Sequence, residues 1–248
     1  IGGDNNSGLM ISGFMNVTGN MASGLHFSGI ANITGQIFGG LMASGLLNVV
    51  GEHMNGLQIA GIANITASKL NGVQVALCNY ATKARGLQIG LVNYYKEDMK
   101  GFQLGLVNAN PDTKVQMMVY GGNATPANIG VRFKNQLFYT ILGVGSMYQG
   151  LNDKFSASAS YRAGLSFPLY KGLSISGDLG YQHIEAFDNK DEVIPKRLYA
   201  LQARANLEYQ FTKKFGIFAT GGYGVTRFYN KSSNYDKGAI IEAGIVLF

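Results

Sequence analysis

Residues 155–168 read FSASASYRAGLSFP and alternate strictly between two kinds of side chain. Apolar residues occupy the odd positions from Phe155 to Phe167, and the even positions hold serines, Arg162 and Gly164. A period of two places successive side chains on opposite faces of a β-strand. The stretch is much longer than the roughly five or six residues usual for a strand in a soluble protein. It predicts a long strand with one apolar face and one polar face.

The whole C-terminal half repeats this pattern, with aromatic residues near the ends of its segments. Eight strands are predicted, at residues 114–121, 128–134, 136–148, 155–168, 172–185, 198–211, 215–229 and 238–248. Long alternating strands with aromatic ends are typical of lipid-facing and lumen-facing positions. The sequence therefore predicts an all-β chain whose residues 114–248 form an eight-stranded antiparallel transmembrane β-barrel.

The predicted connections also alternate, between short turns and longer polar loops. The longer ones are at residues 122–128, 149–154, 186–196 and 230–237. Short periplasmic turns and longer external loops are the rule for outer-membrane barrels. If the C-terminus is periplasmic, all four longer connections lie outside.

Charged residues on the polar faces of these strands are expected to point into the lumen. They are Arg132, Arg162, Asp178, Arg204, Glu208 and Glu242. An eight-stranded barrel is narrow enough for side chains to fill it. Three cations and three anions in that space should pair, because a buried unpaired charge is costly. A filled interior is favoured, and a narrow polar pathway or small-ligand site is the alternative.

We predict no catalytic site, cofactor or metal. His183 lies close in sequence to Glu185, but Ser146 and Ser232 have no context that marks a nucleophile. The carboxylates of the predicted loop 186–196 match no defined calcium loop. Cys78, the single cysteine, permits neither a disulfide within the chain nor a zinc site, and is expected to be a small buried side chain.

The N-terminal part is an internal repeat. Its units begin at Gly8, Gly24, Gly40, Gly56, Gly72, Gly86 and Gly101, a spacing of 16 residues followed by 14 and 15. The first four follow Gly-Leu-x-x-x-Gly-[Ile/Leu/Phe]-x-Asn. A unit of this length suits two short strands and two turns, so residues 1–113 are predicted to form a β-solenoid of about seven coils. Paired membrane helices are a weaker alternative, because Asn and Thr interrupt the apolar residues.

One asparagine recurs in every unit. These residues are Asn16, Asn32, Asn48, Asn64, Asn79, Asn93 and Asn108. Asn tolerates a left-handed backbone, so they are predicted at the corners of the coils. Stacked coils would place them in register, where their amides can bond to one another along a ladder.

The charge distribution argues against nucleic acid and for a covered solenoid. The net charge is +6, but the basic residues are scattered rather than gathered in a patch. Residues 5–51 contain no Asp, Glu, Lys or Arg. A free solenoid normally carries charges on its outer face. We expect this part to be covered by a partner protein or by the membrane interface, unless it is simply a neutral Ser/Thr/Asn-rich surface.

Four parts of the sequence resemble known bacterial proteins. The ending Gly238–Phe248, GAIIEAGIVLF, resembles the C-terminal strand by which the barrel-insertion machinery recognises outer-membrane barrels, and Phe248 would be its terminal signal. Residues 167–174 and 209–216 resemble periplasmic turns of small OmpA/OmpX-like barrels. The repeats resemble Gly-Leu-x-Ile-Gly-Leu-x-Asn surface-repeat proteins. By parity Glu242 and Phe248 share a face, which predicts either a bulge in the last strand or an imperfect signal.

The resemblances imply an integral protein of the bacterial outer membrane, in contact with lipid and lipopolysaccharide. The leading hypothesis is a non-enzymatic structural or accessory subunit that binds other outer-membrane proteins through its uncharged solenoid. The alternatives are an adhesin or ligand-binding module that uses the external loops and, less favoured, a narrow pore or membrane enzyme. An even strand number places the solenoid in the periplasm if the C-terminus is periplasmic, whereas the surface-repeat resemblance points outside. The chain begins at Ile1, which fits a removed signal peptide or a trimmed sequence.

Overall fold

The structure is a computed structural model that describes residues 3–146, 148, 155–187, 197–229 and 234–248. All regular secondary structure in these residues is β-strand. The chain divides into two compact units, residues 1–112 and residues 113–248. The division falls one residue before the boundary predicted from the sequence.

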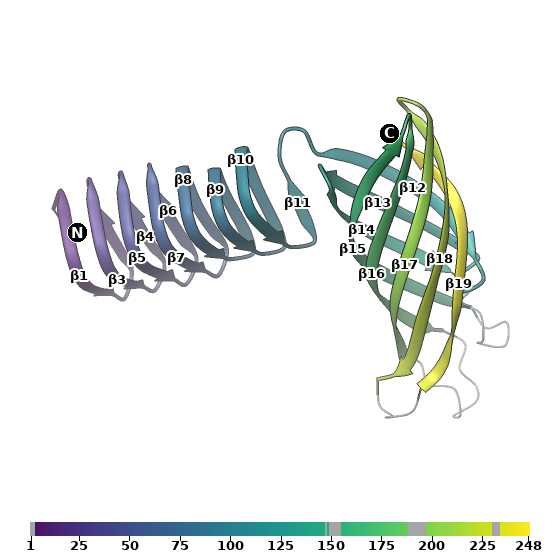
Figure 1. The fold of residues 1–248 in the computed structure, drawn as a ribbon. Coiled ribbons are helices and arrows are strands. Elements are labelled where there is room, and N and C mark those ends of the chain that lie inside the picture. The colour runs from purple at the N-terminus through teal and green to yellow at the C-terminus, as the bar shows by residue number, and fades with distance from the viewer. Residues whose placement is uncertain (1–2, 147, 149–154, 188–196, 230–233) are drawn as a thin grey trace. The chain divides into compact units, whose positions relative to one another are not determined.

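The first unit is a stack of parallel β-coils (Figure 1). Its strands are β1 (Asn5–Ser12), β2 (Met15–Thr18), β3 (Met21–Ser28), β4 (Ala31–Thr34), β5 (Ile37–Ser44), β6 (Leu47–Val50), β7 (His53–Ala60), β8 (Ala63–Val75), β9 (Cys78–Ile89), β10 (Val92–Leu104) and β11 (Val107–Ala109). Each strand pairs in parallel with its equivalent one coil away, so Leu9 stands beside Leu25 and Leu25 beside Leu41. From β8 onward a strand continues around a corner without a break, which the expected pattern of two separate strands per coil did not include.

Glycine at the start of each repeat unit allows the chain to turn inside the long strand. All seven of these glycines have positive φ, for example +104° at Gly24 and +136° at Gly56. A Cβ on Gly24 would also collide with the carbonyl oxygen of Gly8 in the preceding coil. An L side chain strongly disfavours such a backbone, so the repeat requires Gly there.

Side chains that point into the coils form the core of this unit. Phe38, Met42, Met54 and Leu70 are fully buried and belong to one cluster. They stand in columns because successive coils are in register. The core is therefore a set of vertical ladders, each built from one position of the repeat.

The second unit is a closed antiparallel barrel of eight strands, in which β12 pairs with β19 (Figure 1). Its strands are β12 (Lys114–Gly122), β13 (Ala127–Asn135), β14 (Phe138–Ser146), β15 (Ser156–Tyr170), β16 (Leu173–Ala186), β17 (Arg197–Thr212), β18 (Phe215–Phe228) and β19 (Asn234–Leu247). The predicted strands match these closely. The main difference is in the last strand, where residues 234–237 belong to β19 rather than to the preceding loop.

Side chains alternate around the barrel wall as predicted. On β17 the even positions from Leu198 to Glu208 are buried, whereas the odd positions from Leu201 to Tyr209 are exposed. The inward residues of the barrel include an apolar cluster of Met118, Tyr120, Tyr139, Ile141, Phe218 and Val246.

The last strand departs from the expected terminal signal. Glu242 and Val246 point inward, and Phe248 packs against the inner apolar cluster. The pairing of β19 with β18 is regular from Asp236 to Leu247, so no bulge reverses the faces near the end. The terminal aromatic therefore shares the inner face with Glu242.

Candidate functional site

The six lumen charges meet as three ion pairs in the barrel interior. Arg132 binds both carboxylate oxygens of Glu208, at 2.6 and 3.0 Å. Arg162 binds both oxygens of Asp178 at 2.8 Å. Arg204 binds Glu242 at 3.1 and 3.2 Å, and Nη1 of Arg162 also lies 3.7 Å from that carboxylate. Arg162 and Asp178 lie on consecutive strands, whereas the other two pairs join strands that are not consecutive in the chain.

Neutral polar groups complete this network. Tyr139 Oη and Asn206 Nδ2 each donate to Asp178 Oδ2 at 2.8 Å. Asn206 Oδ1 accepts from Arg162 at 3.1 Å and from Thr220. The six charged residues are only 1–8% exposed. Paired, bidentate and hydrogen-bonded charges are the arrangement in which burial is tolerated. The arrangement matches the filled interior favoured from the sequence.

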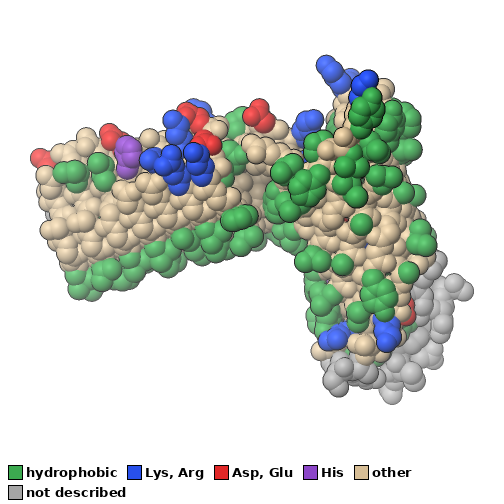
Figure 2. All heavy atoms as spheres, in the orientation of Figure 1, with side chains coloured by type: hydrophobic (Ala, Val, Ile, Leu, Met, Phe, Trp, Pro, Cys, Tyr) green, Lys and Arg blue, Asp and Glu red, His purple; other side chains and the backbone are tan. Residues whose placement is uncertain are grey.

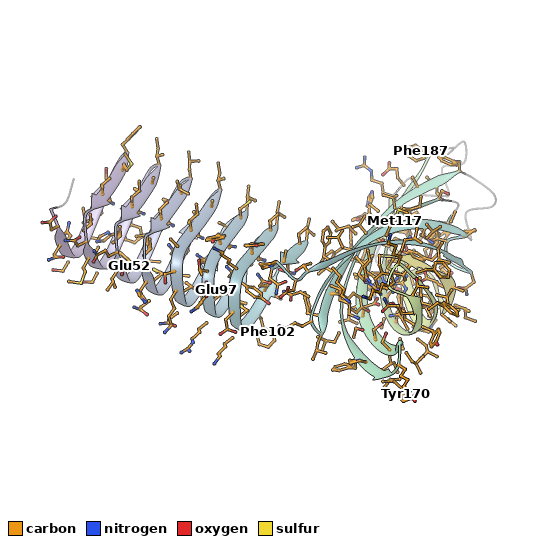
Figure 3. The ribbon with its side chains drawn as sticks, turned by 90° about the horizontal axis from the view of Figure 1, so that it is seen from above. Glu52, Glu97, Phe102, Met117, Tyr170 and Phe187 are labelled. Carbon is orange, nitrogen blue, oxygen red and sulfur yellow. The ribbon has the colours of Figure 1, made fainter. Side chains whose placement is uncertain are left out.

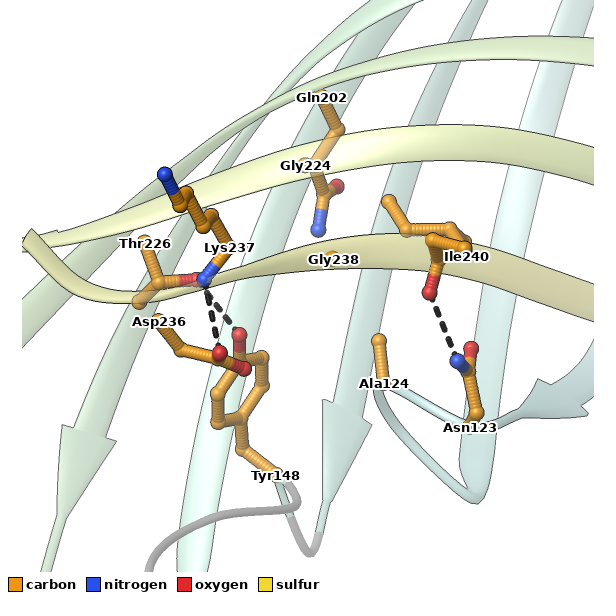
Figure 4. Close-up of a pocket in the computed structure, with 11 residues that line it drawn as sticks. Asn123, Ala124, Tyr148, Gln202, Gly224, Thr226, Asp236, Lys237, Gly238 and Ile240 are labelled. Atoms are coloured by element: carbon orange, nitrogen blue, oxygen red, sulfur yellow. Dashed lines mark hydrogen bonds between the residues drawn. The ribbon is translucent and has the colours of Figure 1, made fainter.

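A cavity lies at each end of the barrel. One, of about 470 Å³, is at the end with the longer connections and is lined by Asn123, Tyr148, Gln202, Thr226 and Asp236 among others (Figure 4). There Tyr148 Oη bonds to Thr226 Oγ1 at 2.6 Å. The other, also about 470 Å³, is at the end with the short turns. Its lining includes Lys114, Gln116, Lys134, Lys171, Glu208 and Phe248.

Two clusters of aromatic side chains lie on the outer surface of the barrel, one near each end. Tyr181, Tyr199 and Tyr229 contact one another near the end with the longer connections, where Tyr181 and Tyr229 share a short hydrogen bond. At the short-turn end Phe211 contacts both Tyr209 and Phe215. Exposed apolar side chains lie between them, including Leu179, Leu201 and Leu207. The barrel wall thus carries an apolar belt with aromatic borders.

In the first unit the repeated asparagines form one continuous ladder. Each donates from Nδ2 to Oδ1 of the next, at 2.9–3.1 Å, from Asn16 to Asn108. Nδ2 also donates to a backbone carbonyl, as Asn48 does to Ile59 at 2.7 Å. The side chains are 0–4% exposed. The predicted left-handed corners are wrong, because none of these asparagines has positive φ. They lie in strands and point into the coils.

A second ladder, made of glutamines, was not predicted from the sequence. Gln58, Gln74, Gln88 and Gln103 stack in one column, with bonds from Nε2 to Oε1 of 2.9, 2.8 and 2.8 Å. Gln58, Gln74 and Gln88 are fully buried. Their alternation with Leu and Ile suggests a polar face toward water, but the parallel register offers each amide a partner inside. The recurrence of Gln two residues after the repeat glycine in the last four units was the available signal.

Because the glutamines point into the coils, the Leu and Ile residues that alternate with them point outward. One column of the solenoid consists of Phe14, Ile30, Leu46, Ile62, Leu77, Leu91 and Leu106. Leu46, Ile62, Leu77 and Leu91 are 44–50% exposed. The neighbouring column includes exposed Ile11, Ile59 and Ile89. Figure 2 shows a band of hydrophobic side chains along one side of the coils. We call these two columns the apolar ridge.

Charged residues occupy a different side of the same coils. Glu52, Lys69, Lys83, Arg85 and Glu97 are among them, and Lys83 pairs with Glu97 at 3.2 Å. Glu52 and Glu97 lie along one side of the solenoid (Figure 3). The ridge side holds no charge on its two columns. Cys78 lies next to the ridge and is exposed, which corrects the expected buried cysteine.

The other predicted groups lie apart from these features. His183 Nε2 is 3.4 Å from Glu185, and its Nδ1 is 2.9 Å from Tyr229 Oη, on the outer wall. Ser232 and the acidic residues of the segment 188–196 lie outside the described residues. Among the residues that the structure describes, no three His, Cys, Asp or Glu side chains gather as a metal site. No helix in that part of the chain is long and apolar enough to span a membrane.

Comparisons with known proteins find similarity to solved structures. No family model matches the sequence, and no curated protein matches it. The solved N-terminal β-barrel domain of Pseudomonas aeruginosa OprF is similar at 17% sequence identity and a TM-score of 0.35. The similarity covers 54% of this chain and 93% of that domain.

Proposed function

We propose that the protein is an integral outer-membrane protein anchored by its barrel. The support is the distribution of side chains on the barrel wall: exposed apolar residues outside, an aromatic cluster near each end, and paired charges inside. Every backbone group of a closed barrel can be bonded within the wall, as a lipid environment requires. Lipid and lipopolysaccharide would contact the belt, and the barrel-insertion machinery would place it there.

The solenoid lies on the periplasmic side in this proposal. Strand β11 ends at Ala109, and the barrel begins at Lys114, at the end that carries the short turns. Short turns are periplasmic in outer-membrane barrels. The short connection between the two units leaves the last coil on that side of the membrane.

The function that the surface supports best is that of a non-enzymatic accessory subunit, which binds another outer-membrane protein through the apolar ridge. The ridge is the observation that carries this proposal, because it is uncharged and continuous over successive coils. Soluble surfaces rarely expose large contiguous apolar patches, and such patches mark sites of association. A structural role also fits a lumen in which the charged side chains pair with one another.

Gentle detergent extraction of the tagged protein, followed by mass spectrometry, tests the docking. The variant Leu46→Glu/Ile62→Glu places two charges on the ridge. The control Ser23→Glu/Asn55→Glu adds the same charge at exposed positions on the other side of the coils.

We expect a stoichiometric outer-membrane partner with the wild type and the control, and its loss with the ridge variant. Recovery of the wild type as a monomer without a partner would contradict the accessory role. Loss of the partner with both variants would show that the ridge is not the contact.

A further inference from the structure

Two lysines face each other at the short-turn mouth of the barrel. Lys114 on β12 is the direct cross-strand partner of Lys134 on β13. Both continue the inward series of Gln116 and Arg132, so their side chains belong to the lumen side. Like charges directly opposite in an antiparallel pair destabilise the sheet. An anionic ligand bound between the two lysines would offset this repulsion.

The lysines line the cavity of about 470 Å³ at this end. Lys134 is half-buried, and its Nζ donates to Ser166 Oγ at 2.8 Å. Lys171, on the β15–β16 turn, adds a third cation to the lining, with its Nζ 5.4 Å from the centre of the Tyr170 ring. The carboxylate in the lining, Glu208, already accepts two bonds from Arg132.

A buried amide supplies an independent sign of a missing acceptor. Gln116 is 1% exposed and lines the same cavity. Its Oε1 accepts from Arg132 Nε at 2.6 Å. Its Nε2 has no hydrogen-bond partner among the described residues. A buried donor without a partner is costly, and native proteins nearly always satisfy such groups.

We propose that this cavity is a binding site for a phosphate group. Lys114 and Lys134 would supply cationic donors, and Gln116 Nε2 an uncharged donor, and all three bonds to the anion would be charge-assisted. A phosphate dianion would balance the two facing lysines and provide several acceptor oxygens. The phosphate can come from a free periplasmic anion or from a lipid headgroup at the rim. The site is independent of the apolar ridge and of what binds there.

The test uses the full chain folded in a nonionic detergent, with inorganic phosphate as the probe in titration calorimetry. The variants Lys114→Gln and Lys134→Gln each remove one charge, and Gln116→Glu removes the donor while keeping an oxygen for Arg132. The control is Lys214→Gln, which removes a lysine from the β17–β18 turn at the same rim, outside the cavity. A parallel arm compares nanodiscs that contain phosphatidylglycerol with nanodiscs of phosphatidylcholine alone.

We expect each cavity variant to bind phosphate at least about tenfold more weakly than wild type, the loss typical of one charge-assisted hydrogen bond. The control should bind as wild type. A thermal stabilisation by phosphatidylglycerol that Lys134→Gln abolishes, without binding of free phosphate, would identify the headgroup as the source. Equal loss in Lys214→Gln, unchanged binding in all cavity variants, or no response in either arm would overturn the proposal. Because Lys114 is exposed, its variant remains informative if a buried variant fails to fold.

Discussion

At the scale of single residues, the barrel interior depends on a few buried ion pairs. Asp178 accepts from Arg162, Tyr139 and Asn206, and Arg162 is 1% exposed. The substitution Asp178→Ala would leave Arg162 without its bidentate partner. We expect a loss of about 3–5 kcal/mol of unfolding free energy, the usual result of breaking a buried pair.

Urea unfolding of the barrel in detergent, followed by the gel shift of the folded form, measures this loss. Asp236→Asn, at an exposed position near the longer connections, is the control and should change stability by less than about 0.5 kcal/mol. Similar stabilities for Asp178→Ala and wild type would show that the interior does not depend on the pair.

His26 gives the solenoid a pH dependence. Its imidazole is 1% exposed, stands edge-on to Phe38, and has no partner for Nε2 among the described residues. Burial lowers the pKa of His26 below its usual 6.5. As the pH falls through 6.5, His26 takes up a proton in the unfolded chain before it does so in the folded chain. The free energy of unfolding therefore decreases as the pH drops below that value.

The matched variant is His26→Met, because Met42 occupies the same position in the next coil. Melting temperatures of the solenoid between pH 7.5 and 5 should fall more steeply in wild type than in His26→Met. Parallel pH profiles would contradict the assignment.

At the scale of the element, each coil depends on one glycine that turns the long strand. Gly56 has φ of +136°, and a Cβ there would collide with the carbonyl oxygen of Gly40. We expect Gly56→Ala to destabilise the solenoid by at least about 2 kcal/mol, since the left-handed backbone alone costs about 1–2 kcal/mol.

Gly39→Ala is the control for this substitution. A Cβ on Gly39 meets nothing within 4 Å, and its φ is not positive. Denaturant unfolding should separate the two variants clearly. Equal effects would mean that the repeat glycine is not a conformational requirement.

At the scale of the whole molecule, much of the fold could be predicted, because barrel strands such as β15 and β17 have one apolar and one polar face. The repeat period likewise gives the stacking of the coils and the asparagine ladder. The alternation of apolar and polar residues does not reveal which face of a strand points inside. In the barrel the paired charges are inside, as predicted, together with an apolar cluster. In the solenoid the glutamines are also inside, because parallel register lets each amide bond to the next.

Some residues of the candidate sites could be predicted from the sequence and others could not, for a related reason. The six lumen charges could be found from parity alone, since each stands on a polar face. The facing of Lys114 and Lys134 depends on the register between β12 and β13, which a sequence does not contain. The exposure of Cys78 depends on which face of the coil is inside, and so was also missed.

The sidedness and covering of the solenoid can be measured directly, because the chain has a single cysteine and Cys78 is exposed beside the apolar ridge. The measurement is labelling of Cys78 by a membrane-impermeant maleimide on intact cells, on cells with a permeabilised outer membrane, and after detergent extraction. We expect no labelling on intact cells, because the solenoid is periplasmic. Labelling should be weak after permeabilisation, because a partner covers the ridge, and complete once detergent has removed the partner. Strong labelling on intact cells would place the uncovered solenoid outside and contradict the account.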